Sequence, residues 1–243
     1  AGVPIRQWVD SRAENFKKLA AVLNISNDDF IRTSAEERHL KGAQKLWQAC
    51  SKDIYKKKYT GLYCVGCEEF KTGKDLVNGE CPYHPGKKPQ TVEEENYFFK
   101  LSKYQSQLLK LIESGEFKII PETRQHEIVN FIKSGLEDFS ISRSQERAKE
   151  WGIPVPGDPP SGGQIMYVWF DALSNYINAL GYAEDGEKFK KYWEKGNGRV
   201  HIVGKDINRF HTVYWPAMLL AAGVRLPSQV FVHGFVSING QKM

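Results

Sequence analysis

The alternation of strand-like and helix-like segments between residues 166 and 232 is the feature that most constrains the fold of this chain. Three short apolar runs predict strands and three longer segments predict helices between them, in the order 166–170, 172–180, 187–194, 200–203, 207–222 and 229–232. Strands spaced in this way are joined by crossover helices, which favours a parallel sheet. Pro216 predicts a kink or a new start within the last helical segment. The expected fold class is α/β.

The first half of the chain has a less regular pattern. Apolar residues at helical spacing predict helices at 8–23, 37–50 and 122–134, and residues 29–33 predict a short strand. The sequence Thr-Val-Glu-Glu at 91–94 has the form of a capping box and predicts that a helix follows it.

The composition sets limits on the class of protein. The chain has 243 residues, of which 41% are hydrophobic and 26% are charged, as in an ordinary globular protein of one or two domains. A net charge of +5 suits an anionic partner such as ATP or tRNA. The longest apolar run, at 218–224, is too short to span a bilayer, so no membrane partner is expected. No secretory signal opens the sequence, which predicts a cytoplasmic protein and leaves an organellar pool open.

Three of the four cysteines lie in one cluster with a histidine. Cys64 and Cys67 form one corner, and Cys81 and His84 form a second corner thirteen residues later. Three thiolates and one imidazole make the closed tetrahedral ligand set of structural Zn²⁺. The segment around them has few apolar residues, so a bound metal would hold it together. The alternative is a reduced, empty knuckle held by its surroundings.

Several sequence strings, in a fixed order, resemble those of one enzyme family. They are IYKKKYTGLYCVGC at 54–67, ENYFFKLS at 95–102, DFSISR at 138–143, WGIPVP at 151–156, YVWFDA at 167–172, GKD at 204–206, FHTVYWP at 210–216, FVHGF at 231–235 and QKM at 241–243. They are spread from residue 54 to residue 243, and they resemble the methionyl-tRNA synthetases, which are class I aminoacyl-tRNA synthetases. The final Lys-Met resembles the start of the KMSKS loop.

The resemblance implies a domain organisation. Residues 1–53 would end the first half of a Rossmann-type domain, and residues 54–137 would form an inserted connective peptide with the zinc knuckle. Residues 138–243 would form the second half of the Rossmann-type parallel sheet, ending at the start of the KMSKS loop.

The resemblance also implies two sets of site residues. Those that match the methionine side-chain pocket are Trp169, Leu173, Tyr176, Ile207, Phe210 and His211. Aromatic walls suit a polarizable thioether, although plain core packing would explain the same residue types. Leu173 stands where bacterial members often have proline. Residues matching the ATP site are Gly204, Asp206, His233, Gly234, Val236 and Lys242, and those matching catalytic positions are Arg143 and Lys205. The alternatives are an ordinary turn at 204–206 and a solvated surface charge at Arg143.

The implied reaction is methionine–tRNA ligation. Methionine attacks ATP, which is used with Mg²⁺, to give methionyl-adenylate and pyrophosphate, and tRNA(Met) then captures the adenylate. The family's HIGH motif, the acidic residue for the methionine ammonium, the rest of the KMSKS loop and the anticodon-binding domain are not in the sequence. We therefore expect the chain alone to be inactive and to need the N-terminal half of the catalytic domain as a partner.

Two other functions are kept open. One is a class I synthetase for leucine, isoleucine, valine or cysteine, although residues 54–121 are too few for an editing domain. The other is a non-catalytic zinc-knuckle module that binds nucleic acid through Lys56, Lys57 and Lys58.

Overall fold

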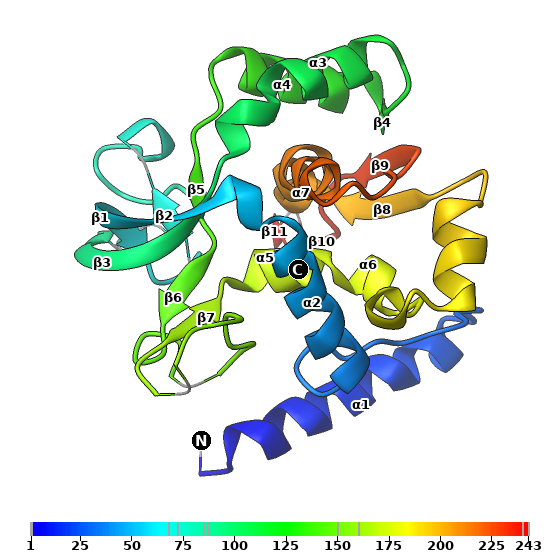
Figure 1. The fold of residues 1–243 in the computed structure, drawn as a ribbon, viewed down its shortest axis with the longest axis horizontal. Helices are drawn as coiled ribbons and strands as arrows, with labels where there is room; N and C mark the ends of the chain where they lie inside the picture. The colour runs from blue at the N-terminus through cyan, green and yellow to red at the C-terminus, as the bar shows by residue number, and fades with distance from the viewer. Residues whose placement is uncertain are drawn as a thin grey trace.

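The chain begins with two helices, α1 (Ile5–Val22) and α2 (Glu37–Ala49) (Figure 1). A computed structural model describes residues 2–67, 69–71, 73–84, 86, 88–149, 151–159, 161–239 and 241–242. The strand expected at 29–33 is wrong, because that segment is irregular. Residues 29–33 pair with no strand among the described residues. The first of them, Asp29, instead accepts hydrogen bonds on both carboxylate oxygens from the guanidinium of Arg38, at 2.7 and 2.9 Å.

A long antiparallel hairpin follows the short helical segment η1 (Ser51–Asp53). Its strands β1 (Ile54–Cys64) and β3 (Gln90–Phe99) pair over ten residues, with β2 (Glu69–Lys71) beside β1 and β5 (Phe139–Ser140) beside β3. The helix expected to follow 91–94 therefore begins later than predicted, at Leu101, and the residues expected on its inner face, Leu101, Tyr104, Leu108 and Ile112, are buried. Burial alternates along β3, so pairing with β1 outweighs the local capping signal. The turn η2 (Gly73–Asp75) lies between β2 and β3.

Helix begins again only at η3 (Leu101–Tyr104) and α3 (Gln105–Glu113). Then come β4 (Lys118–Ile120) and α4 (Glu122–Lys133). Although β4 lies within the expected insertion, it pairs in parallel with a C-terminal strand, β9 (Gln229–His233).

The parallel sheet has the order β4-β9-β8, where β8 is Val200–Gly204 (Figure 1). Its inner face is buried and includes His201, Val203 and Val230. On the outer face, Ile202 is 72% exposed and Phe231 is 41% exposed. The sheet therefore has one covered face and one open apolar face, and its parallel pairing confirms the expected α/β fold class.

The chain returns through β6 (Ser142–Ser144) and β7 (Gln164–Met166), which pair antiparallel, to the short helices α5 (Val168–Leu173) and α6 (Asn175–Asn178). The strand expected at 166–170 is too long, because β7 ends at Met166 and Trp169 lies on a helix. The backbone turns at Tyr167, whose carbonyl accepts from the N–H of Phe170 at 2.8 Å. The carboxylate of Asp171 in the first turn also favours a helix there.

The remaining elements complete the core. They are η4 (Tyr182–Glu184), η5 (Phe189–Glu194), η6 (Lys205–Ile207), η7 (Phe210–Tyr214), α7 (Trp215–Ala222), β10 (Ser237–Ile238) and β11 (Gln241–Lys242). Pro216 lies in the first turn of α7, where its missing N–H costs nothing, so the predicted new start is confirmed. None of the helices in the described ranges combines the length and apolar character needed to cross a bilayer.

Candidate active site

Six residues expected to line the methionine pocket converge between α5, α6 and η7. The Trp169 ring stacks on Phe210 with centroids 3.9 Å apart and planes at 11°. The Tyr176 hydroxyl lies 2.8 Å from Nε2 of His211, and the ring of His211 lies 6.4 Å from that of Trp169. Leu173 on α5 is buried, and Ile207, one helical turn before His211, is half-buried. The structure thus brings these residues together.

Hydrogen bonds fix the tautomer of His211. The carbonyl oxygen of Ile207, 2.9 Å from Nδ1, only accepts, so Nδ1 carries the proton and donates. Nε2 therefore accepts from the Tyr176 hydroxyl. Burial lowers the pKa of His211, against the opposing effect of the Ile207 carbonyl, and burial raises the pKa of Tyr176 to about 12. Both groups are neutral near pH 7, which suits an uncharged side chain.

His201 supports this pocket from the sheet, and sequence reasoning did not select it. Its ring lies 4.1 Å from that of Tyr176, and its Nε2 accepts from Nε1 of Trp215 at 3.2 Å. Burial, and then the nearby His211, lowers its pKa to about 3. The alternation of β8 indicates this position, because His201 lies two residues before the buried Val203 and therefore on the same face of the strand. We call Trp169, Tyr176, His201, Phe210 and His211 the pocket cluster.

The residues expected at the nucleotide gather where β8 and β9 end. Gly204 and His233 are paired across these strands, and a Cβ on Gly204 would lie 2.8 Å from Oδ1 of Asp206. The carboxyl ends of parallel strands are the usual place for such a site. His233 donates from Nδ1 to the carbonyl of Gly234 at 2.6 Å. Lys205 is exposed, and its Nζ lies 4.2 Å from the Phe235 ring centroid.

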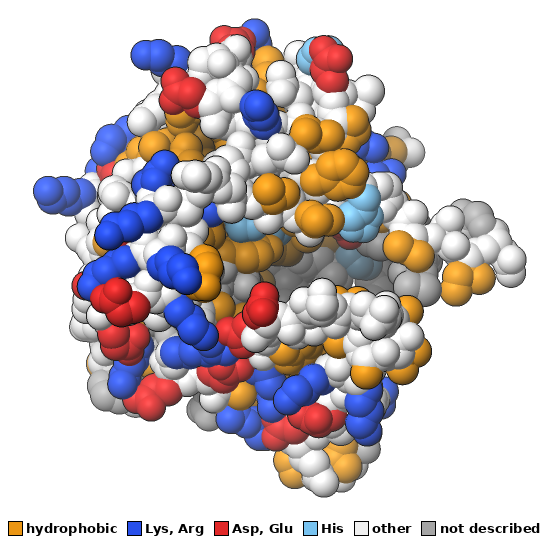
Figure 2. All heavy atoms as spheres, turned by 90° about the vertical axis from the view of Figure 1, so that its right-hand side faces the viewer, with side chains coloured by type: hydrophobic (Ala, Val, Ile, Leu, Met, Phe, Trp, Pro, Cys, Tyr) orange, Lys and Arg blue, Asp and Glu red, His pale blue; other side chains and the backbone are white. Residues whose placement is uncertain are grey.

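Of the last two residues expected at the nucleotide site, the structure describes the side chain of Val236 but not that of Lys242. Val236 is 59% exposed. Lys242 belongs to β11, but its side chain lies outside the described part of the structure, as does Met243. Figure 2 shows apolar and histidine side chains around a hollow on the face that lies to the right in Figure 1.

Arg143 is buried on β6, so a solvated surface charge is excluded for it. Its Nη1 donates to the carbonyl of Ser142 at 2.7 Å, and its guanidinium lies 4.3 Å from the Tyr167 ring and 5.5 Å from the Tyr63 ring. It lines two clefts of about 680 and 1050 Å³ whose described walls do not include Trp169 or His211. The linings of these clefts include Tyr167 and Val168, which directly precede Trp169 in the sequence.

The cysteine knuckle has the geometry of a zinc site. The ligand atoms of Cys64, Cys67, Cys81 and His84 all lie within 4.8 Å of one another. Nδ1 of His84 is 3.3 Å from Sγ of Cys67 and 3.8 Å from both other sulfurs. Zinc–sulfur bonds of about 2.3 Å would put tetrahedral ligands about 3.8 Å apart. A Cβ on Gly66 would lie 2.5 Å from the His84 ring, so the turn needs glycine. The donor set fits Zn²⁺.

Comparison with known proteins agrees with this geometry. A family model described as "tRNA synthetases class I (M)" matches residues 1–87 and 83–243. The chain belongs to this family. The methionine–tRNA ligase of Brucella suis is 49% identical over the whole chain, and that of Caldanaerobacter subterraneus is 48% identical. The chain spans 46% and 37% of these two relatives, respectively, which is less than half of their length.

Solved structures of class I (M) synthetases share the fold. Mycobacterium tuberculosis methionyl-tRNA synthetase bound by methionyl-adenylate superposes with a TM-score of 0.86 and 40% identity, covering 97% of this chain and 46% of that one. The apo form gives a TM-score of 0.82 and 39% identity, covering 97% of this chain and 47% of that one. As a class I (M) synthetase chain, the molecule has the Rossmann-type parallel sheet that the sequence predicted.

Proposed function

We propose that this chain supplies the methionine pocket and part of the ATP site of a methionine–tRNA ligase. The observation that carries the proposal is the neutral pocket cluster, in which the Tyr176–His211 hydrogen bond stands beside the stacked Trp169 and Phe210. An apolar, polarizable thioether fits such walls, whereas a charged side chain would lose its hydration there. Ile207 and Leu173 would complete the walls.

In the first step, a carboxylate oxygen of methionine attacks the α-phosphorus of ATP. The bond between the α- and β-phosphates breaks, pyrophosphate leaves and methionyl-adenylate forms. Asp206 would accept from a ribose hydroxyl, while Gly204 lets the nucleotide approach the backbone. His233, Gly234 and Val236 would border the adenine.

Charge at the phosphates would be neutralised by Mg²⁺ and by cationic side chains. We assign Lys205 and Lys242 to this role, and Arg143 to an acidic substrate group. In the second step, the terminal ribose hydroxyl of tRNA(Met) attacks the carbonyl carbon of the adenylate, and AMP leaves. The protein thus acts by positioning and electrostatics, without a covalent intermediate.

The open face of the sheet supports a further part of the proposal. Parallel sheets are almost always covered on both faces, yet Ile202 and Phe231 are exposed. We infer that this face receives the N-terminal half of the catalytic domain, with residues 1–53, 54–137 and 138–243 as the domain divisions. The knuckle would hold a structural Zn²⁺ within the second of these. We place the reaction in the cytoplasm.

The test is amino-acid-dependent ATP–pyrophosphate exchange, screened over all twenty amino acids. It uses the longest natural polypeptide that contains residues 1–243. Exchange with methionine alone, lost in Trp169→Ala and His211→Ala, would support the proposal. Exchange with leucine, isoleucine or valine would overturn the pocket assignment. No exchange from folded protein that binds tRNA without methionine or ATP would favour the nucleic-acid-binding module.

A further inference from the structure

A closed network of buried polar groups joins the first turn of α2 to the two short helices that carry pocket residues. It consists of His39, Asp171, Ser174 and Asn178, of which Asp171 is 8% exposed and the other three are fully buried. The comparisons and the resemblance assign no role to these four residues. Figure 1 shows α2 lying across α5 and α6.

Hydrogen bonds determine how the His39 ring is oriented. The amide nitrogen of Asn178 lies 3.2 Å from the carbonyl oxygen of His39 and 3.2 Å from its Nδ1. A carbonyl oxygen only accepts, so the atom facing it is the NH₂ group of Asn178. Nδ1 must then accept as well, which leaves the ring proton on Nε2.

That proton is directed at Asp171. Nε2 of His39 lies 3.6 Å from Oδ1 of Asp171, which is longer than a hydrogen bond, so the neutral ring faces the carboxylate with its N–H dipole. Nε2 has no hydrogen-bond partner among the described residues. On the opposite side, Asn178 donates to Oγ of Ser174 at 2.7 Å, and that hydroxyl donates to the carbonyl of Asp171 at 2.6 Å. The network therefore closes on itself.

Network residues and pocket residues interleave along the same ten positions. Trp169, Leu173 and Tyr176 belong to the pocket, while residues 171, 174 and 178 belong to the network. Helices α5 and α6 have six and four residues, too few to be stable on their own. Their orientation must therefore come from tertiary contacts, and the network is the polar contact that α2 makes with both.

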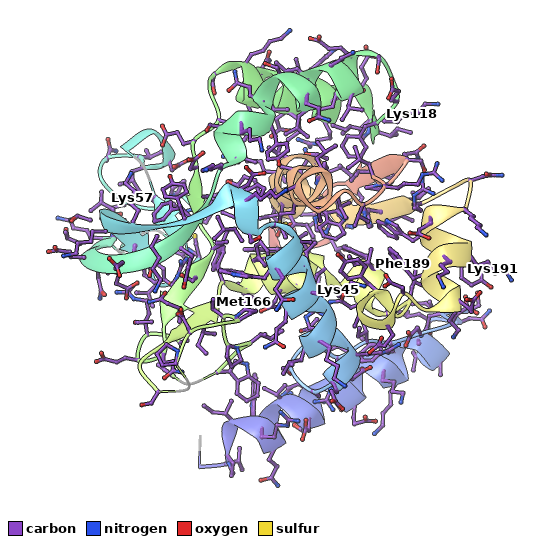
Figure 3. All side chains as sticks on the ribbon, in the orientation of Figure 1. Lys45, Lys57, Lys118, Met166, Phe189 and Lys191 are labelled. Atoms are coloured by element: carbon purple, nitrogen blue, oxygen red, sulfur yellow. The ribbon has the colours of Figure 1, made fainter. Side chains whose placement is uncertain are left out.

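Close packing strengthens this connection. Gly42, one turn after His39 on α2, has no room for a side chain, because a Cβ there would lie 2.0 Å from Oδ1 of Asn178. Farther along α2, Lys45, labelled in Figure 3, donates to the carbonyl of Tyr182 at 2.9 Å and so fixes the segment that follows α6. Helix α2 thus provides a rigid base for α5 and α6.

We propose that His39 is a positioning residue of the methionine pocket, which it orients through Asp171 and Asn178 without touching the substrate. The proposal rests on the proposed function for its substrate, but its structural part does not. Loss of the His39 ring nitrogens would free α5 and α6 to tilt, and Trp169 and Tyr176 would move with them. Recognition of methionine would weaken while recognition of ATP at the ends of β8 and β9 would not.

The first test needs no substrate. Hydrogen–deuterium exchange is measured on peptides covering 168–178 in the longest natural polypeptide that contains the chain. His39→Phe keeps a buried ring but removes both nitrogens, and exchange in 168–178 should become about tenfold faster. Peptides from β8 and β9 should be unchanged. Ile132→Val, a fully buried control on α4, should leave 168–178 unchanged. Equal acceleration across the whole chain, or none in 168–178, would overturn the proposal.

The second test separates the two substrates kinetically. In ATP–pyrophosphate exchange, His39→Phe should raise the KM for methionine about tenfold and leave the KM for ATP within about twofold. Asp171→Asn keeps a polar oxygen facing the N–H of His39 and should stay closer to wild type than Asp171→Ala. Parallel changes in both KM values would contradict a positioning role. A wild-type protein without methionine-dependent ATP–pyrophosphate exchange would instead overturn the proposed function. The hydrogen–deuterium exchange test of the positioning role would still apply.

Discussion

The cysteine knuckle and the pocket cluster both depend on histidine, but the two regions use the imidazole in opposite ways. In the knuckle, His84 is a partly exposed ligand donor in a segment with little apolar core. In the pocket cluster, His201 and His211 are buried among aromatic rings, and each has a lowered pKa. With the proposed zinc bound, the first region would be ordered by its four donor atoms, whereas the second is ordered by packing.

This difference predicts which perturbations each region will feel. Metal removal should disorder the knuckle and leave the pocket cluster folded. Changes of core volume should act mainly on the pocket cluster, whereas acid should act on both regions, because zinc ligands bind only when they are deprotonated. The four predictions below test that separation, in order of decreasing effect.

Zinc loss should have the largest effect. Purified chain should hold about one zinc, and Cys64→Ser should lose it, because structural zinc sites contribute about 10 kcal/mol or more of apparent binding free energy. Metal analysis checks the content, and hydrogen exchange checks that residues 64–84 lose protection while β8 and β9 keep it. Cys50→Ala is the matched control, since Cys50 lies in the core. Zinc-free wild-type protein with an ordered knuckle would refute this prediction.

Acid should destabilise the pocket cluster through His201. Its pKa is about 3 when folded and 6.5 otherwise, so unfolding takes up a proton between these values. The contribution is complete above pH 6.5 and is lost as the pH falls through this window, by about 1.4 kcal/mol per unit at most. Urea unfolding of wild type and His201→Gln at pH 7 and 5 measures it. The variant should show the smaller pH dependence, and equal slopes would contradict the prediction.

Gly42→Ala should weaken the packing of α2 on α6 and lower the stability of the protein, without changing the zinc content of the knuckle. The added Cβ would overlap Asn178, and overpacking of this kind costs about 2 kcal/mol. Thermal unfolding checks the loss, and zinc content should stay at the wild-type level. Gly198→Ala is a control, because a Cβ there meets nothing within 4 Å. A stabilised Gly42→Ala variant would show that helix propensity outweighs the contact.

Tyr176→Phe should have the smallest effect. It removes the hydroxyl that donates to His211 and leaves a buried acceptor unsatisfied, at about 1 kcal/mol. The KM for methionine should then rise about fivefold, while the KM for ATP should not change. An equal rise in both would indicate that Tyr176 acts on the fold rather than on the pocket.

The sequence predicted two strands of the parallel sheet and the cysteine cluster, because both depend on local pattern, but it missed the third strand, β4. Alternation in 200–203 and 229–232 marks β8 and β9, and the cysteine spacing marks the ligand set. It failed at β3, where the capping-box form at 91–94 was outweighed by pairing with β1, whose partner residues are 27 to 45 positions away. Nothing local could have signalled that partner.

The site was predicted unevenly for the same reason. Ile207 and His211 were grouped because the family resemblance assigns both to one pocket, and their spacing of four residues fits one face of a helix. The network of His39 with Asp171 and Asn178 spans about 140 positions, so only the folded chain brings it together. For Arg143, which the resemblance matched to a catalytic position, the sequence left a solvated surface charge as the alternative, and burial beside Tyr63 and Tyr167 excludes that alternative.

The open face of the β8–β9 sheet also has a practical consequence for the laboratory. An exposed apolar face of a sheet favours association with other apolar surfaces. A preparation of residues 1–243 alone therefore exposes an apolar surface at Ile202 and Phe231 that favours self-association. Self-association of folded molecules, rather than unfolding, will set the highest concentration at which such a sample stays monodisperse. Replacing these two residues by charged ones is the simplest way to reduce it.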